Sequence, residues 1–292
     1  MSYVSTEIES QPDSWRRALA LLPSVSPSLP SPGERVAVIG CGTSWFMAEA
    51  YAVLREAAGL GETDFYTASA LPSSRTYDRV LAISRSGTTT EVLDALSGTS
   101  ARRTSIVADA STPVGQVSDD CVVLDFADER SVVQTVFATT TLMLLRASLG
   151  ESVERVIAET ERVLRVAPDT QVDAASQYTF LGQGWAHGLA REAALKMREA
   201  SRSWTESYPQ MEYRHGPISI AEPGRVVWVF GEPVAGLLDD VSATGATVVC
   251  DDLDPVSDLV RVQLLAVRLA EAAGFDPDRP RNLTRSVVLG AP

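Results

Sequence analysis

Short apolar runs alternate with longer amphipathic segments along most of the chain. Apolar runs bounded by glycine or polar residues are typical of buried parallel strands, whereas apolar positions spaced three or four apart are typical of helices. The pattern predicts strands at residues 35–39, 64–67, 80–83, 104–107, 121–124, 178–181, 225–230 and 247–250. It predicts helices at residues 5–22, 45–58, 131–149, 151–166, 185–201 and 260–273, followed by an irregular tail.

This regular alternation predicts an α/β fold built on doubly wound parallel sheets. The length of 292 residues is enough for two domains of ordinary size. We therefore expect an amino-terminal helix and loop over residues 1–34, a first subdomain over 35–150, and a linker helix with a second subdomain over 151–292. Each subdomain is expected to be a parallel sheet flanked by helices, an α-β-α sandwich.

An internal repeat supports two similar halves. The run Val38–Gly42 matches Phe180–Gly184 at a constant offset of 142 residues (180 − 38). Both copies predict a strand, a Gly-x-Gly turn and a helix. The pair Thr43 and Ser44 of the first copy is replaced by a tryptophan and an alanine in the second.

One stretch concentrates hydroxyl side chains after a predicted strand. Residues 84–90, here called the hydroxyl turn, contain five serines and threonines around Gly87. Short hydroxyls beside the free N–H groups of a helix N-terminus suit a phosphate dianion. The alternative is a cluster of N-cap residues that only starts a helix. Because the second copy of the repeat has no hydroxyls in place of Thr43 and Ser44, a phosphate is expected to bind to the first half alone.

Composition narrows the classes of partner. The formal charge of −13 argues against nucleic acid and anionic membranes as partners, and no apolar run is long enough to span a bilayer. The amino terminus has no apolar core of a secretory signal, and three scattered cysteines indicate reduced thiols, so a cytoplasmic location is expected.

No metal site or cofactor is expected either. The chain has only two histidines, and Trp45 stands where a dinucleotide-binding Gly-x-Gly-x-x-Gly motif needs its third glycine.

A second polar cluster lies in the other half. Glu192, Lys196 and Glu199 share one face of a predicted helix, and His215 follows in an irregular segment. A solvated salt-bridge face and a structural histidine are the alternatives. Together with a phosphate site, however, a carboxylate and an imidazole suffice for aldose–ketose chemistry. The imidazole opens the sugar ring, and the carboxylate moves a proton between adjacent carbons through an enediol.

Five motifs in order resemble the SIS (sugar isomerase) family, most closely the isomerase half of glucosamine-6-phosphate synthase and stand-alone phosphosugar isomerases and deaminases. They are Gly40-Cys-Gly-Thr-Ser44, Ser84-Arg-Ser-Gly-Thr-Thr89, Glu192-Ala-Ala-Leu-Lys-Met-Arg-Glu199, Arg214-His-Gly-Pro217 and Pro280-Arg-Asn-Leu-Thr-Arg-Ser-Val287. The resemblance implies two SIS subdomains in a homodimer with shared active sites, acting on a small-molecule sugar phosphate.

The resemblance also implies roles for individual residues. Glu199 matches the proton-shuttling glutamate, and His215 matches a ring-opening histidine supplied by the partner subunit. The expected phosphate- and substrate-binding positions are Cys41, Gly42, Thr43, Ser44, Ser84, Arg85, Ser86, Thr89, Val132, Glu192 and Lys196. The glutamine-hydrolysing domain of the synthase is expected to be missing from this chain.

Arg285 replaces the tail lysine that forms an imine with a ketose in the synthase. A guanidinium stays charged and forms no imine, although it can neutralise an enediolate or orient a sugar hydroxyl. The predicted activity is therefore isomerisation or deamination of an amino-sugar 6-phosphate, such as glucosamine 6-phosphate or its N-acetyl form. The alternatives are dehydration of an N-acetylhexosamine 6-phosphate after the same C2 deprotonation, and a non-catalytic sugar-phosphate sensor.

Overall fold

The computed structural model describes residues 2–167 and 169–290, and the chain divides into two compact units. The first unit comprises residues 10–153 and 282–292, and the second comprises residues 1–9 and 154–281. The main division between the units therefore lies near residue 150. Two segments differ from the expectation, because the amino-terminal helix contributes to both units and the tail after residue 281 groups with the first unit.

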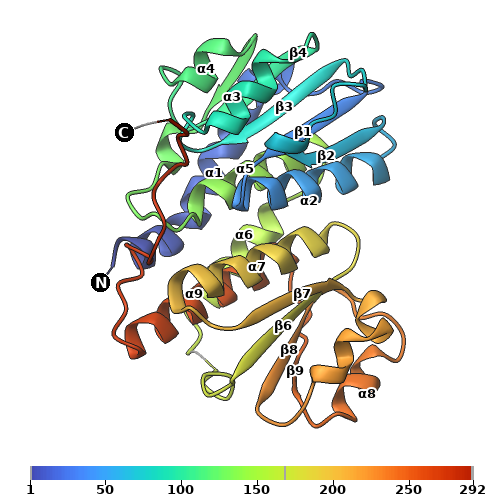
Figure 1. Cartoon of the computed structure of the whole chain (residues 1–292), viewed down its shortest axis with the longest axis vertical. Helices are drawn as coiled ribbons and strands as arrows, with labels where there is room; N and C mark the ends of the chain where they lie inside the picture. Colours follow the sequence, from blue (N-terminus) through green and yellow to red (C-terminus); the bar gives the residue numbers. More distant parts are fainter. Residues whose placement is uncertain (1, 168, 291–292) are drawn as a thin grey trace. The chain divides into compact units, whose positions relative to one another are not determined.

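The first unit is a three-layer α/β unit around a five-stranded parallel sheet of order β2-β1-β3-β4-β5 (Figure 1). Helices α2 and α5 pack together on one face, and α3 and α4 cover the other. The strands are β1 (Val36–Gly40), β2 (Thr63–Thr67), β3 (Arg79–Ser84), β4 (Arg102–Val107) and β5 (Asp120–Val123). The helices are α1 (Tyr3–Val25), α2 (Thr43–Ala57), α3 (Thr90–Ser97), α4 (Pro113–Val117) and α5 (Val136–Ser148).

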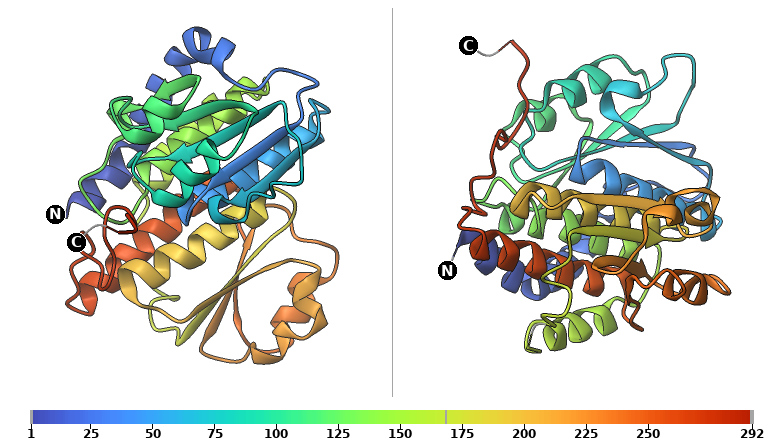
Figure 2. Two further views of the ribbon diagram at one scale, coloured as in Figure 1. Left: turned by 45° about the horizontal axis from the view of Figure 1, so that its top comes forward. Right: turned by 60° about the horizontal axis from the view of Figure 1, so that its bottom comes forward.

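The second unit repeats this plan around a four-stranded parallel sheet of order β7-β6-β8-β9 (Figure 2). Helices α7 and α9 pack against each other, with α6 beside α9, and α8 packs into the cluster on the opposite face. The strands are β6 (Gln177–Gly182), β7 (Thr205–Pro209), β8 (Arg225–Phe230) and β9 (Thr247–Val249). The helices are α6 (Glu154–Val163), α7 (Ala186–Ser201), α8 (Leu237–Ser242) and α9 (Pro255–Ala272).

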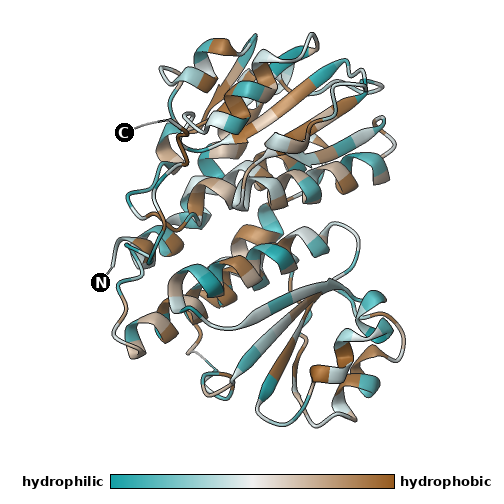
Figure 3. Ribbon diagram, in the orientation of Figure 1, coloured by the Kyte–Doolittle hydropathy of each residue, from teal (hydrophilic) through white to brown (hydrophobic). Residues whose placement is uncertain are grey.

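The predicted α/β class with two parallel sheets is confirmed. The central strands β1 and β3 are buried at every position, as their continuous apolar runs predicted, and Figure 3 shows them mostly in the brown of hydrophobic residues. The helix predicted over residues 131–149 starts later, because residues 131–135 form a loop before α5. Strand β7 was not predicted, since its residues Thr205–Pro209 show no apolar periodicity.

The repeat extends into the strand pairing. Val36 of β1 pairs with Thr63 of β2, and Tyr178 of β6 pairs with Thr205 of β7. Each residue of the second pair lies 142 positions after its counterpart in the first pair (178 − 36 and 205 − 63). The turns agree as well, because Gly42 and Gly184 have φ angles of 55° and 57°. The two halves therefore share backbone geometry as well as sequence.

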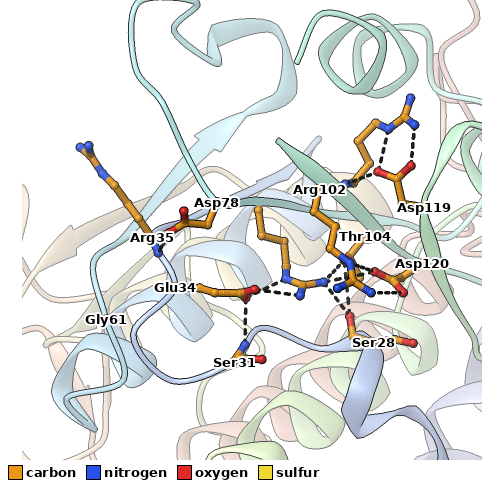
Figure 4. Close-up of polar contacts among 12 residues, drawn as sticks. Ser28, Ser31, Glu34, Arg35, Gly61, Asp78, Arg102, Thr104, Asp119 and Asp120 are labelled. Atoms are coloured by element: carbon orange, nitrogen blue, oxygen red, sulfur yellow. Dashed lines mark hydrogen bonds and ion pairs between the residues drawn. The ribbon is translucent and has the colours of Figure 1, made fainter. Parts of the chain in front are cut away.

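A polar network closes the amino end of the first sheet (Figure 4). Arg79, at the start of β3, is only 1% exposed and donates to both carboxylate oxygens of Glu34 at 2.8 and 3.0 Å. The same guanidinium reaches Thr104 at 2.6 Å and Asp120 at 3.3 Å. Bidentate pairing of this kind fixes geometry as well as charge. The network anchors the segment before β1 at the end of the sheet opposite the Gly-x-Gly turn.

Asp258 is a buried carboxyl in the second unit whose titration we expect to affect stability. It accepts a 2.8 Å hydrogen bond from the indole of Trp228 and pairs with Arg261 at 3.1 Å. Burial raises the pKa of Asp258 to about 7, although Arg261 and Trp228 act in the opposite direction. An unfolded aspartate has a pKa of about 3.9, so between about pH 4 and 7 only the folded chain holds this proton.

The free energy of unfolding is therefore expected to fall as pH rises through that window. The Asp258→Asn variant should lose this part of the pH dependence, on the order of a few kcal/mol between pH 4 and 7. Urea unfolding at several pH values measures the slope, with Asp239→Asn at an exposed position of α8 as the control. Equal slopes in wild type and Asp258→Asn would contradict the assignment.

No helix within residues 2–167 and 169–290 is both long enough and apolar enough to cross a membrane.

Candidate active site

The hydroxyl turn begins where β3 ends, beside the end of β1. The chain runs from β1 to β2 on one side and then to β3 on the other, so β1 and β3 flank the topological switch point of the sheet. Their register pairs Ile39 with Ala82, which places Cys41 level with Ser84. Ligands of doubly wound sheets bind outside the carboxyl ends of strands at this point. The motifs Gly40–Ser44 and Ser84–Thr89 are thus brought together at the carboxyl end of the first sheet.

The hydroxyl turn folds tightly on itself. Ser84 Oγ accepts a hydrogen bond from the Gly87 N–H at 3.2 Å, and Ser86 Oγ lies 3.5 Å from Thr89 Oγ1. Gly87 has a φ of +62°, and a Cβ there would lie 2.0 Å from the Thr112 hydroxyl. Glycine is therefore required for both the backbone conformation and the close approach. The predicted phosphate-binding hydroxyls Ser84, Ser86 and Thr89 lie together in this turn.

The remaining phosphate-binding candidates start α2. Gly42 occupies the N-cap with a φ of 55°, and Thr43 and Ser44 follow in the first turn with exposures of 4% and 3%. Gly40 precedes them where a Cβ would lie 2.6 Å from the Ser44 carbonyl carbon, so only glycine allows this helix to approach β1 so closely. Cys41 is half-buried, and burial raises the pKa of its thiol, which favours the neutral form.

Arg85 contacts a neighbouring loop rather than the hydroxyls beside it. Its side chain is fully buried and donates to the carbonyls of Ser131 and Val132 at 3.1 and 3.2 Å and to Glu129 at 3.4 Å. Glu129 in turn accepts from the Thr135 and Val136 N–H groups at 2.5 and 2.8 Å. The expected phosphate-site arginine thus organises the 128–135 loop, which carries Val132.

Sequence reasoning did not identify Glu129, because the helix predicted over 131–149 absorbed part of this loop. An acidic residue just before an apolar helix was the available signal, since carboxylates are favoured at helix N-termini.

Arg285 lies on the tail and belongs to the same unit. Its guanidinium donates to the Glu129 carbonyl and to the carboxylate of Asp128. The tail also contacts the hydroxyl turn, because Thr88 donates to Ser286 at 3.0 Å and the Thr90 N–H donates to the Val287 carbonyl at 3.3 Å. Residue 285 is therefore engaged with a protein carboxylate in this structure.

The carboxylate cluster of the second unit lies on α7 as predicted. Lys196 is 1% exposed and lies between Glu192, at 3.4 Å, and Glu199, which its ammonium contacts closely. The side chain of Glu192 is 1% exposed, whereas that of Glu199 is 18% exposed. The alternative of a solvated salt-bridge face is therefore excluded for Glu192 and Lys196. A buried ammonium that bridges two carboxylates fixes the position of Glu199 and leaves part of it accessible.

His215 is exposed at the end of a short 3-10 helix, Glu212–His215. Gly216 follows with a φ of 132°, a conformation that side-chain-bearing residues rarely adopt. Trp204 and Met211 of the same unit are also exposed, at 73% and 46%.

The predicted site residues therefore fall into two groups. The first unit holds the hydroxyls, the Val132 loop and Arg285, whereas the second unit holds the glutamates, Lys196 and His215. The first group offers short hydrogen-bond donors for a small anion, and the second offers a positioned carboxylate and an accessible imidazole for proton transfer.

No protein-family model matches the chain. The chain is 29% identical over 320 residues to a glutamine–fructose-6-phosphate aminotransferase [isomerizing] of Aeropyrum pernix, with 87% of this chain and 51% of that protein covered. It is 28% identical over 338 residues to the corresponding protein of Methanothermobacter thermautotrophicus, with 98% and 57% covered. The chain thus spans about half the length of the curated relatives it matches.

Solved structures share the fold. A glucosamine-6-phosphate deaminase from Thermotoga maritima superposes with a TM-score of 0.79 at 24% identity, covering 99% of this chain and 100% of that one. A tagatose-6-phosphate ketose/aldose isomerase from Escherichia coli superposes with a TM-score of 0.80 at 18% identity, covering 97% of each. The fold is that of SIS proteins with two subdomains. The sequence relatives are glutamine–fructose-6-phosphate aminotransferases, which agrees with the predicted resemblance to the isomerase half of such a synthase.

Proposed function

We propose that this chain is an enzyme that converts an amino-sugar 6-phosphate, such as glucosamine 6-phosphate or its N-acetyl form, through an enediolate. The observation that carries the proposal is the hydroxyl turn at the switch point of the first sheet. Ser84, Ser86 and Thr89 supply neutral donors there, and Thr43 and Ser44 add two more from the start of α2. Such a site holds a dianion in a protein whose net charge is −13.

Proton transfer is assigned to the second unit. Glu199 removes the proton from C2 of the open-chain sugar, and the electron pair moves toward the C1 oxygen to give an enediolate. His215 transfers a proton between a hydroxyl and the ring oxygen during ring opening. Lys196 holds Glu199 in place and offsets its charge. A proton then passes from the heteroatom on C2 to the C1 oxygen, and return of the proton from Glu199 to C1 completes an isomerisation with no net change in protons.

The enediolate has other possible fates, and residue 285 bears on them. Deamination releases the C2 nitrogen as ammonia after isomerisation, whereas dehydration expels the C3 hydroxyl. Arg285 forms no imine, so a route through a protein imine is disfavoured. Dehydration of an N-acetylhexosamine 6-phosphate is the second candidate, because an amide nitrogen is a poor leaving group and the same C2 deprotonation starts both reactions.

A homodimer completes the proposal. His215 is exposed in the second unit, and Met211, four residues before it, is also exposed. Burial of these side chains against a second copy would remove apolar surface from water, and it would bring the imidazole of one subunit to the site of the other.

The test is incubation with glucosamine 6-phosphate, N-acetylglucosamine 6-phosphate and fructose 6-phosphate in deuterated water, followed by NMR. Deuterium at C1 or C2 indicates enolisation, free ammonium indicates deamination, and a C3-deoxy product indicates dehydration. Unphosphorylated glucosamine is the matched control and should remain unchanged, because it lacks the anion. Binding without any deuterium incorporation would favour a sugar-phosphate sensor and overturn the enzymatic proposal.

A further inference from the structure

The tail of the first unit, residues 282–290, contacts two separate loops. At its start Asn282 adopts a left-handed conformation with φ of 63°. Arg285 then contacts Asp128 and the Glu129 carbonyl at the beginning of the 128–135 loop. This is the loop that Arg85 fixes through the Ser131 and Val132 carbonyls.

The second set of contacts reaches the hydroxyl turn. Thr88 Oγ1 donates to Ser286 Oγ at 3.0 Å, the Thr90 N–H donates to the Val287 carbonyl at 3.3 Å, and the Leu289 N–H donates to Thr90 Oγ1 at 2.9 Å. The hydroxyls of this turn therefore divide into two sets. Ser86 and Thr89 lie together, whereas Thr88 and Thr90 hold the tail.

These contacts are individually weak. Arg285 and Asp128 are 41% and 45% exposed, and exposed ion pairs add little stability. Val287, Val288 and Leu289 remain 54%, 47% and 62% exposed, so the tail buries little apolar surface. A segment held only by a few such contacts opens readily. Because so few contacts hold the tail, we expect the loss of one of them to raise the population of the open tail by a few-fold.

We propose that Arg285 and Asp128 form a tether that keeps the tail closed on the 128–135 loop and the hydroxyl turn, and that both are positioning residues. The inference rests on the proposed function in assigning these two loops to the sugar and the phosphate. Residue 285 then acts through Asp128 and the tail. Its guanidinium serves neither as a charge directed at the enediolate nor as a substitute for an imine-forming lysine.

Two mechanisms for Arg285 make opposite predictions for Asp128. If Arg285 attracted the anionic substrate directly, removal of the neighbouring carboxylate in Asp128→Asn would strengthen binding and Arg285→Gln would weaken it. If the two residues form a tether, the variants act in the same direction, and the double variant is no worse than either single one.

The experiment is a double-mutant cycle of Arg285→Gln and Asp128→Asn, with Arg285→Lys as the conservative variant. Hydrogen–deuterium exchange of peptides covering residues 282–290 and 88–92 reports tail opening. Titration with inorganic phosphate reports the anion site, and kcat and KM on the sugar phosphate that the NMR experiment shows to be converted report catalysis. Circular dichroism confirms that each variant folds.

Each single variant should exchange the tail amides about fivefold faster and lower kcat/KM by a similar factor, with phosphate affinity unchanged. The double variant should match the singles, and Arg285→Lys should stay close to wild type, since an ammonium still pairs with Asp128. Tighter phosphate binding in Asp128→Asn, additive effects, or unchanged tail exchange would each overturn the tether. The exchange measurements need no turnover, so they decide on the tether even if no sugar phosphate is converted.

Discussion

Replacing Glu199 with glutamine is expected to lower kcat by about 10²–10⁴-fold while leaving the affinity for the sugar phosphate within about twofold of wild type. Glutamine keeps the size of the side chain and an oxygen that can accept a hydrogen bond from Lys196. Its amide is not basic, so it cannot take the C2 proton. The proposed phosphate site lies on the first unit, so we expect the substitution to leave it unaffected.

Steady-state kinetics and calorimetric titration separate the two effects, and exchange of the C2 proton with deuterated water isolates the deprotonation step. Glu271→Gln, an exposed position near the end of α9, is the matched control and should behave as wild type. Turnover by Glu199→Gln at the wild-type rate would remove Glu199 from the mechanism. Loss of binding together with turnover would mean that Glu199 holds the substrate.

Replacing Ser86 with alanine is expected to weaken binding of the sugar phosphate and of inorganic phosphate by about 10- to 100-fold. A hydrogen bond to a charged group contributes about 1.5–3 kcal/mol, and every 1.4 kcal/mol changes the affinity tenfold. Ser86 Oγ also accepts from the Thr88 N–H at 3.3 Å, so part of the loss comes from a looser turn.

The matched control is Ser97→Ala, an exposed serine at the last residue of α3, the helix that follows the hydroxyl turn. Isothermal titration with inorganic phosphate measures the anion site without any turnover. If both alanine variants bound phosphate as wild type does, Ser86 would not contribute to a phosphate site.

The fold was predictable because its signals are local. Continuous apolar runs such as Val36–Ile39 and Val226–Phe230 identify strands buried on both faces, and glycine turns mark where they end. Strand β7 was not predicted because its residues show no regular alternation of apolar and polar positions. It lies at the edge of its sheet. Only pairing with β6 defines it as a strand.

The candidate site was predictable as a set of residues and less so as a set of contacts. The hydroxyl turn and the face of α7 lie within single local motifs, so spacing alone brings their members together. The contact of Arg85 with Ser131 and Val132 joins positions more than forty residues apart. That of Arg285 with Asp128 joins positions 157 residues apart. No local pattern encodes such pairs, because they depend on how the chain packs.

The 142-residue repeat has a further consequence. Glu192, Lys196 and Glu199 of α7 correspond by this offset to Ala50, Leu54 and Ala57 of α2, which carry no acid–base chemistry. Conversely, Thr43 and Ser44 correspond to Trp185 and Ala186. The two copies of the repeat thus carry different functional groups on similar backbones, in keeping with the proposed division between anion binding in the first unit and proton transfer in the second.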